Sequence, residues 1–158
     1  MTDELKKDYT RRISQGSATE IIVILYEIAL GYMADAKEYQ KKGNHDDARR
    51  ECTNAARVLS HLMGSLDFSY EISMHLFRVY EFISKEISMA VIKDDKERLD
   101  APIRMMKTLK ESFEKLAKED KSGPMMNNSE VVYSGLTYSK GSLNDNTVVG
   151  NNNRGFMA

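Results

Sequence analysis

Three histidines are the side chains of this sequence best suited to acid–base or metal chemistry. They are His45, His61 and His75, and imidazole is both a common metal ligand and the group that titrates nearest neutral pH. A di-iron site in a helical protein requires two Glu-x-x-His motifs and two further carboxylates. Glu71 and His75 are four residues apart instead of three, and the sequence contains no second copy. The sequence therefore predicts no metal site.

The motifs of other catalytic sites are absent from the sequence as well. It contains no HExxH zinc motif, glycine-rich phosphate loop, G-x-S-x-G elbow or Cys-x-x-Cys pair. The stretch "SHLMGSL" around His61 resembles histidine-phosphotransfer domains, helical bundles in which a surface histidine accepts phosphate beside a lysine. No lysine accompanies His61, so the phosphate charge would lack a local partner. We expect no catalytic residue and no cofactor, and a phosphotransfer module using His61 is kept as an alternative function.

Four helical segments are expected to position these residues. The first begins at a capping box, in which Ser17 and Glu20 each satisfy a backbone N–H of the other. It runs to Lys42 and ends before Gly43-Asn44, a pair typical of helix C-termini. The connections to the later segments are only a few residues long, which makes consecutive helices antiparallel neighbours.

The other three helices are indicated by apolar residues at alternating steps of four and three, the spacing of one helix face. These apolar positions are Ala48, Cys52, Ala55, Leu59, Leu62 and Leu66; Ile72, Leu76, Val79, Ile83, Ile87 and Ala90; and Leu99, Ile103, Met106, Leu109, Phe113 and Leu116. We expect Asp67 or Ser69 to cap the third helix and Asp94 or Asp95 to cap the fourth. Pro102 should bend the fourth helix or confine regular helix to the residues after it.

These segments predict an all-α protein, an antiparallel up-down-up-down four-helix bundle over residues 17–120. A short N-terminal segment, residues 1–16, precedes the bundle. Residues 121–158 form a low-complexity tail rich in Asn, Gly and Ser, a composition typical of a flexible and largely irregular chain. A small cluster of apolar residues and tyrosines in "EVVYSGLTYS" favours the alternative that the tail docks on the bundle.

Composition excludes several classes of partner. The chain has 158 residues and a net charge of −1, which fits one domain and does not suit a nucleic-acid binder. Cys52 is the only cysteine, so no internal disulfide forms, as in reducing compartments. The N-terminus lacks the apolar core of a secretory signal, and the longest apolar run is too short for a bilayer. We expect a cytoplasmic protein with no nucleic-acid partner and no membrane insertion.

That apolar run, "IIVILYEIALGYM" at residues 21–33, points to binding as the function. Glu27 is its only charge, so the apolar surface extends beyond the stripe that a bundle helix ordinarily buries. Exposed apolar patches mark interaction sites, and a groove between helices can receive the amphipathic segment of a partner. A homodimer formed through this face, or an unassigned helical adaptor, remains an open alternative.

Three segments carry a resemblance to one protein family, in the same order and spacing. "SATEIIVILYEIAL", "SHLMGSLDF" and "LFRVYEFISKEISMAVIKDD" resemble the start of the first helix, the second-to-third turn and the third helix of FliS, the flagellar export chaperone family. The tail stretch "VYSGLTYSKGSLN" is similar to tails of clostridial members. The resemblance implies a chaperone that binds the disordered C-terminal segment of flagellin, prevents its premature polymerisation and aids delivery to the flagellar type III export apparatus through an export gate component.

The same motifs suggest which residues bind the partner. Leu25, Tyr26, Leu66, Phe68 and Tyr80 match family positions and are expected to contact the partner or to shape the wall of its groove. The full candidate set for partner binding is Ile13, Ile22, Leu25, Tyr26, Leu66, Asp67, Phe68, Tyr80 and Ile83. The tail stretch "VVYSGLTY" and the N-terminal segment around Tyr9 are expected to compete with the partner for this surface.

Overall fold

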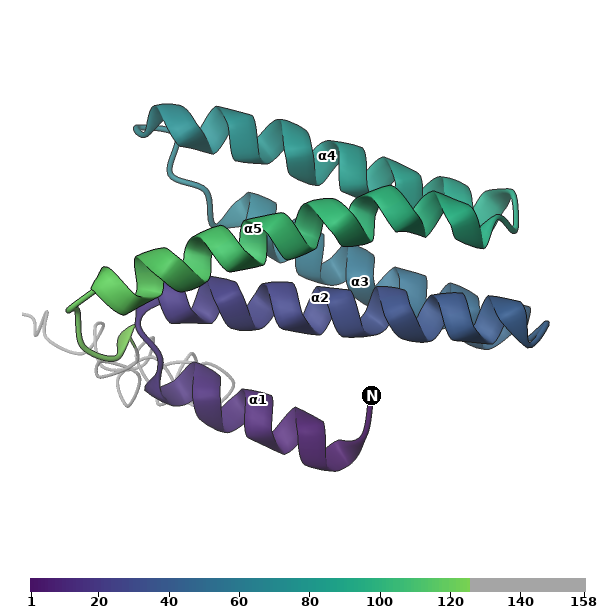
Figure 1. The fold of residues 1–158 in the computed structure, drawn as a ribbon, viewed down its shortest axis with the longest axis horizontal. Coiled ribbons are helices and arrows are strands. Elements are labelled where there is room, and N and C mark those ends of the chain that lie inside the picture. Colours follow the sequence, from purple (N-terminus) through teal and green to yellow (C-terminus); the bar gives the residue numbers. More distant parts are fainter. Residues whose placement is uncertain (126–158) are drawn as a thin grey trace, which may run out of the picture.

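The computed structural model describes residues 1–125, and residues 126–158 lie outside this range. The described part is helical (Figure 1). Its elements in chain order are α1 (Asp3–Gln15), α2 (Ala18–Lys41), α3 (His45–Gly64), α4 (Glu71–Ile92), the 3-10 helix η1 (Lys96–Leu99) and α5 (Asp100–Glu119). The docking predicted for the tail therefore falls outside the described residues.

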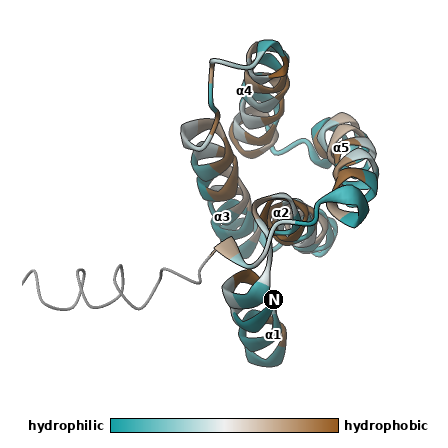
Figure 2. Cartoon of the chain, turned by 90° about the vertical axis from the view of Figure 1, so that its left-hand side faces the viewer, coloured by the Kyte–Doolittle hydropathy of each residue, from teal (hydrophilic) through white to brown (hydrophobic). Residues whose placement is uncertain are grey.

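Helices α2 to α5 form the predicted bundle, and the all-α class is confirmed. Each runs antiparallel to the next along the chain (Figure 1), and the end-on view shows the four helices around a common centre (Figure 2). Helix α2 packs against α3 and α5, and α4 packs against the same two helices. Helix α1 lies outside the bundle against α2 (Figure 2). It is the one helix for which the sequence predicted only a short segment.

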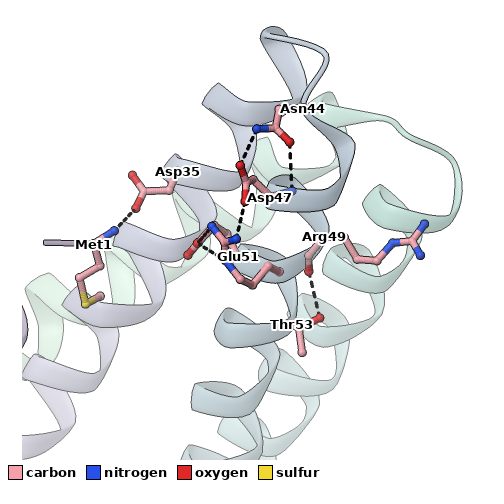
Figure 3. Close-up of polar contacts among 8 residues, drawn as sticks. Met1, Asp35, Asn44, Asp47, Arg49, Glu51 and Thr53 are labelled. Carbon is pink, nitrogen blue, oxygen red and sulfur yellow. Dashed lines mark hydrogen bonds and ion pairs between the residues drawn. The ribbon is translucent and has the colours of Figure 1, made fainter.

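Local signals explain where the first two bundle helices begin and end. The predicted capping box is present, with Ser17 Oγ accepting from the Glu20 N–H at 3.3 Å and a Glu20 carboxylate oxygen accepting from the Ser17 N–H at 2.8 Å. Gly43 adopts a φ of 70° just after α2, a conformation that glycine takes without steric cost. The Asn44 side chain accepts from the Asp47 N–H at 3.3 Å and caps α3 (Figure 3).

The starts of the last two bundle helices differ from the prediction. Tyr70 occupies the N-cap position of α4 and makes no side-chain cap hydrogen bond, so neither expected cap is used. Asp67 accepts from the Ser69 N–H at 2.9 Å and stabilises the preceding turn instead. The segment expected as the start of the fourth helix is η1, capped by Asp95, and α5 begins at Asp100. Pro102 thus lies in the first turn of α5, where no intrahelical N–H bond is needed.

The core is built around a pair of tyrosines. The hydroxyls of Tyr26 on α2 and Tyr80 on α4 are 2.6 Å apart and buried, and Phe113 of α5 packs edge-on against the Tyr26 ring at 5.5 Å. Most predicted apolar positions face this core, but Ile72 and Leu116 do not and are 60% and 52% exposed. The ends of α4 and α5 that carry these two residues lie apart in Figure 1, so neither residue is covered.

Candidate partner-binding surface

The histidines singled out by the sequence do not converge in the structure. His45 Nδ1 lies 3.0 Å from an Asp94 carboxylate oxygen at one end of the bundle. His61 and His75 are exposed on α3 and α4. Within residues 1–125, no three His, Cys, Asp or Glu side chains gather in a way that suits a metal ion. Cys52 is buried, which raises its thiol pKa to about 11 and disfavours the nucleophilic thiolate.

Helix α1 covers part of the surplus apolar face of α2. The Arg12 guanidinium donates to both oxygens of Glu27, at 2.7 and 3.3 Å, and so pairs with the only charge in the apolar run. The hydrogen bond to Glu27 raises the Arg12 pKa. Ile13 is half-buried, and burial together with the nearby Glu27 charge raises the pKa of Tyr9. The prediction that the segment around Tyr9 competes for the apolar surface is consistent with this position.

A pocket of about 490 Å³ lies where α1, α2 and α5 meet. Val23 and Ile24 contribute nearly buried apolar side chains to it. The remaining lining residues are Arg12, Gln15, Gly16, Glu20, Glu114, Ala117 and Lys118. Both signs of charge therefore surround an apolar surface.

The turn between α3 and α4 presents a second apolar surface. Phe68 is 55% exposed and packs edge-on against Phe77 at 5.9 Å. Tyr70, Ile72 and Met74 follow it and are also exposed. We call these four exposed residues, Phe68, Tyr70, Ile72 and Met74, the turn surface. Ile72 and Met74 are two positions apart on α4 and point to different sides of it, so the four side chains surround the start of α4 and do not form one flat patch. Exposed apolar side chains mark interaction sites.

Polar bonds hold the turn surface in a fixed shape. Ser73 Oγ donates to the Asp67 carbonyl oxygen at 2.6 Å, which ties the turn to the first turn of α4. Hydrogen bonds from the Ser69 side chain and N–H lower the Asp67 pKa, so its carboxylate remains charged and exposed beside Phe68. Glu71, between Tyr70 and Ile72, is a second exposed acidic residue. Exposed apolar side chains beside two acidic residues favour an apolar partner segment that brings a donor or cation.

The predicted partner-binding residues differ in position and burial. Leu66, Asp67 and Phe68 come together in the α3–α4 turn, while Ile22 and Leu25 are half-buried on α2 and pack against the core. The buried group is Tyr26, Tyr80 and Ile83, each at most 1% exposed. In this structure these three side chains belong to the core. A role for them in partner binding, by contact or by shaping the wall of the groove, stays a prediction.

The sequence reasoning missed several exposed apolar residues of α4 and the turn before it. Tyr70 and Met74 of the turn surface, Phe82 on α4 and Ile92 at the end of α4 are all exposed. The four-three spacing identifies the side of a helix that faces the core, so it does not detect apolar residues on the other side. A search for apolar residues that break the spacing would have found Met74, Phe82 and Ile92.

The fold and these surfaces define a helical bundle that carries apolar surfaces for interaction. No helix within residues 1–125 is both long and apolar enough to cross a bilayer. A family model described as "Flagellar protein FliS" matches residues 1–120. The chain belongs to the FliS family, whose members are flagellar export chaperones for flagellin and not enzymes. No curated protein matches the chain in sequence.

Proposed function

We propose that this chaperone binds the C-terminal segment of flagellin in the cytoplasm, prevents its premature polymerisation and delivers it to a component of the flagellar export gate. The observation that carries the proposal is the exposed apolar turn surface on a chain that belongs to a flagellin-chaperone family. A monomeric protein rarely exposes such a group of large apolar side chains unless a partner covers it.

The client is proposed to occupy two regions. Phe68 and its neighbours in the turn surface are open to contact, and Leu66, two residues before Phe68, is half-buried and packs against the core. The apolar side of α2 around Val23 and Ile24 becomes available to the client only where α1 moves away from α2. A segment that folds on binding buries roughly 1,000–3,000 Å² and loses about 2–5 kcal/mol to ordering, so it requires more than one small patch.

Calorimetric titration tests the proposal. The chain is titrated with a synthetic peptide of a flagellin C-terminal segment and, as the control, with a scrambled peptide of the same composition. Saturable binding of the native peptide with a negative heat-capacity change is expected, because apolar surface is buried. Equal heats from both peptides, or no saturation, would contradict the proposal. Sedimentation of the free chain detects the competing possibility, a homodimer through the turn surface.

A further inference from the structure

A groove on the opposite side of α4 from α5 is not used by the proposed client surfaces. It lies between α3 and α4 and has a volume of about 530 Å³. The residues that line it are Arg49, Cys52, Thr53, Ala56, Ile87, Ser88, Val91 and Ile92. Most of these side chains are small or apolar, and the small ones leave the space between the two helices open. Neither the turn surface nor the pocket beside α1 shares a lining residue with this groove.

The groove continues to the end of the bundle. A second recess of about 350 Å³ shares Arg49, Val91 and Ile92 with it and extends to His45 and Asp94. Ile92 is 75% exposed, the largest exposed fraction among the large apolar side chains of residues 1–125. An isoleucine this exposed at the junction of two recesses gives the groove an apolar anchor point for a partner.

The rim of the groove on α3 carries arginines, and Asp94 is the acidic residue that lines the adjoining recess. Arg50 pairs with Asp47 and Glu51 on the other side of α3, whereas the Arg49 guanidinium extends away from these carboxylates (Figure 3). Arg49 forms no ion pair with any residue in the described range 1–125. Arg57 follows two turns later on α3, is exposed, and is likewise without an ion pair to a described residue.

On the α4 side, Lys85 adds a third cation. It stands three residues before the groove residue Ser88 and is exposed. Glu86, the next residue along α4, pairs with Arg98 at 3.0 Å, and Glu81 lies one turn before Lys85. Arg49 and Arg57 are separated by about 12 Å along α3, given a rise of 1.5 Å per residue. Basic groups thus flank an apolar trough on both helices.

We propose that this groove docks an acidic amphipathic helix of a second protein, at a site separate from the flagellin surface. A helix lays its apolar stripe into a groove between two helices, and carboxylates on its flanks would pair with Arg49, Arg57 and Lys85. Charge complementarity of this kind mainly sets the choice of partner. The site leaves the client surfaces free, so the chaperone holds its client and the second protein together.

Two synthetic helical peptides test the groove on the full chain. Each has about 16 residues, roughly 24 Å as a helix, with the same leucine stripe; one carries glutamates on its flanks and the other lysines. The acidic peptide is expected to bind and to shift the methyl resonances of Ile87, Val91 and Ile92. The basic peptide should bind at least about tenfold more weakly. No saturable binding of the acidic peptide up to about 1 mM, or shifts confined to the turn surface, would overturn the proposal.

Charge-reversal variants separate the groove from general electrostatics. Arg49→Glu and Arg57→Glu should each weaken the binding of the acidic peptide by about tenfold. Arg104→Glu, at an exposed position on α5, should leave the affinity for this peptide unchanged. Equal weakening by all three variants would reduce the effect to net charge and overturn the proposal. The contrary result is a dimer of the free chain that Arg49→Glu dissociates. That result would assign the groove to a second copy of the chain and overturn the proposal.

The flagellin peptide distinguishes this proposal from the proposed function. With saturating flagellin peptide present, the acidic helix is expected to bind with unchanged affinity. Mutual exclusion of the two peptides would overturn the claim of separate sites. Loss of flagellin binding alone would contradict the proposed function and leave the groove intact.

Discussion

At the residue scale, the hydrogen bond between Tyr26 and Tyr80 explains how two tyrosine hydroxyls can be buried in the core. Burial raises the pKa of both phenols, so each hydroxyl stays neutral, and the two satisfy one another inside the core at 2.6 Å. The sequence indicated an apolar residue with a polar tip, which suits a binding wall and a core equally well. Only the packing of α2 against α5, with Phe113 on the Tyr26 ring, decides for the core.

We predict that Tyr26→Phe destabilises the fold by about 1–3 kcal/mol, because it leaves the buried Tyr80 hydroxyl without a partner. The double variant Tyr26→Phe/Tyr80→Phe should recover part of this loss, since no buried hydroxyl remains. Urea unfolding of both single variants and the double variant measures the cycle. Strictly additive losses in the double variant would mean that the two hydroxyls do not interact in solution.

The second residue-scale prediction concerns Phe68. Phe68→Ala should weaken flagellin-peptide binding by more than about 1 kcal/mol, because large aromatic side chains dominate such interfaces. The matched control is Phe82→Ala, which removes another exposed phenylalanine of α4 outside the turn surface. Calorimetric titration measures both affinities. Equal losses in the two variants would place the client elsewhere than the turn surface.

The third prediction concerns the titration of Asp120. Hydrogen bonds from Ser122 and Thr19 lower its carboxyl pKa from 3.8 to about 2. A carboxyl pKa that is lowered by folding adds stability above its unfolded value, and this stability is lost as the pH falls from about 4 to about 2. NMR titration should therefore find a midpoint near 2, and Thr19→Val should raise it. A midpoint near 4 in the unchanged chain would show that these bonds do not form.

At the element scale, the sequence predicted the bundle helices well where a local signal decides the structure. The capping box at Ser17 and the glycine at residue 43 set the ends of α2 as expected. The start of α4 was not predictable in this way. Asp67, an expected cap, accepts a hydrogen bond from the Ser69 N–H within the turn and not from an N–H of the helix. The fold was thus readable from spacing and caps, whereas the connections depended on tertiary contacts.

Helix α1 was missed because its apolar content is low, yet signals for it exist. Leu5, Tyr9 and Ile13 recur every four residues, and Thr2 accepts from the Leu5 N–H at 3.4 Å as a cap. Such a short helix is marginal alone and depends on packing against α2. A narrow apolar stripe on a polar helix therefore predicts a helix that docks on a neighbour.

This weak attachment leads to the fourth prediction. Arg12→Ala removes the ion pair with Glu27 that joins α1 to α2, and a partly exposed pair of this kind contributes about 0.2–1 kcal/mol. Amide hydrogen exchange in residues 3–15 should accelerate, while exchange in α3 and α4 stays unchanged. Arg11→Ala is the control, because Arg11 pairs with Asp8 inside α1. Equal acceleration in both variants would attribute the effect to the loss of helix stability alone.

At the scale of the whole molecule, the described chain ends beside the junction of α1 and α2. The Met125 N–H donates to the Gly16 carbonyl oxygen at 3.0 Å, and Thr19 Oγ1 donates to Asp120 at 2.7 Å. Residues 126–158 therefore continue from a point next to the pocket between α1, α2 and α5. The candidate site is distributed over this junction, the α3–α4 turn and α2, and no single sequence motif describes such a surface. Leu66, Asp67 and Phe68 are consecutive in the sequence, so their proximity could be predicted, whereas their role in binding stays a prediction.

The fifth prediction follows from this attachment point. The tail stretch "VVYSGLTY" was expected to compete with the client, and it lies outside the described residues. A tethered segment reaches a nearby site at an effective concentration on the order of millimolar, so even weak docking would be populated. Deleting residues 126–158 leaves the Met125 bond in place and should tighten flagellin-peptide binding in calorimetry. Unchanged affinity after the deletion, with the client still bound at the turn surface, would show that the tail does not compete.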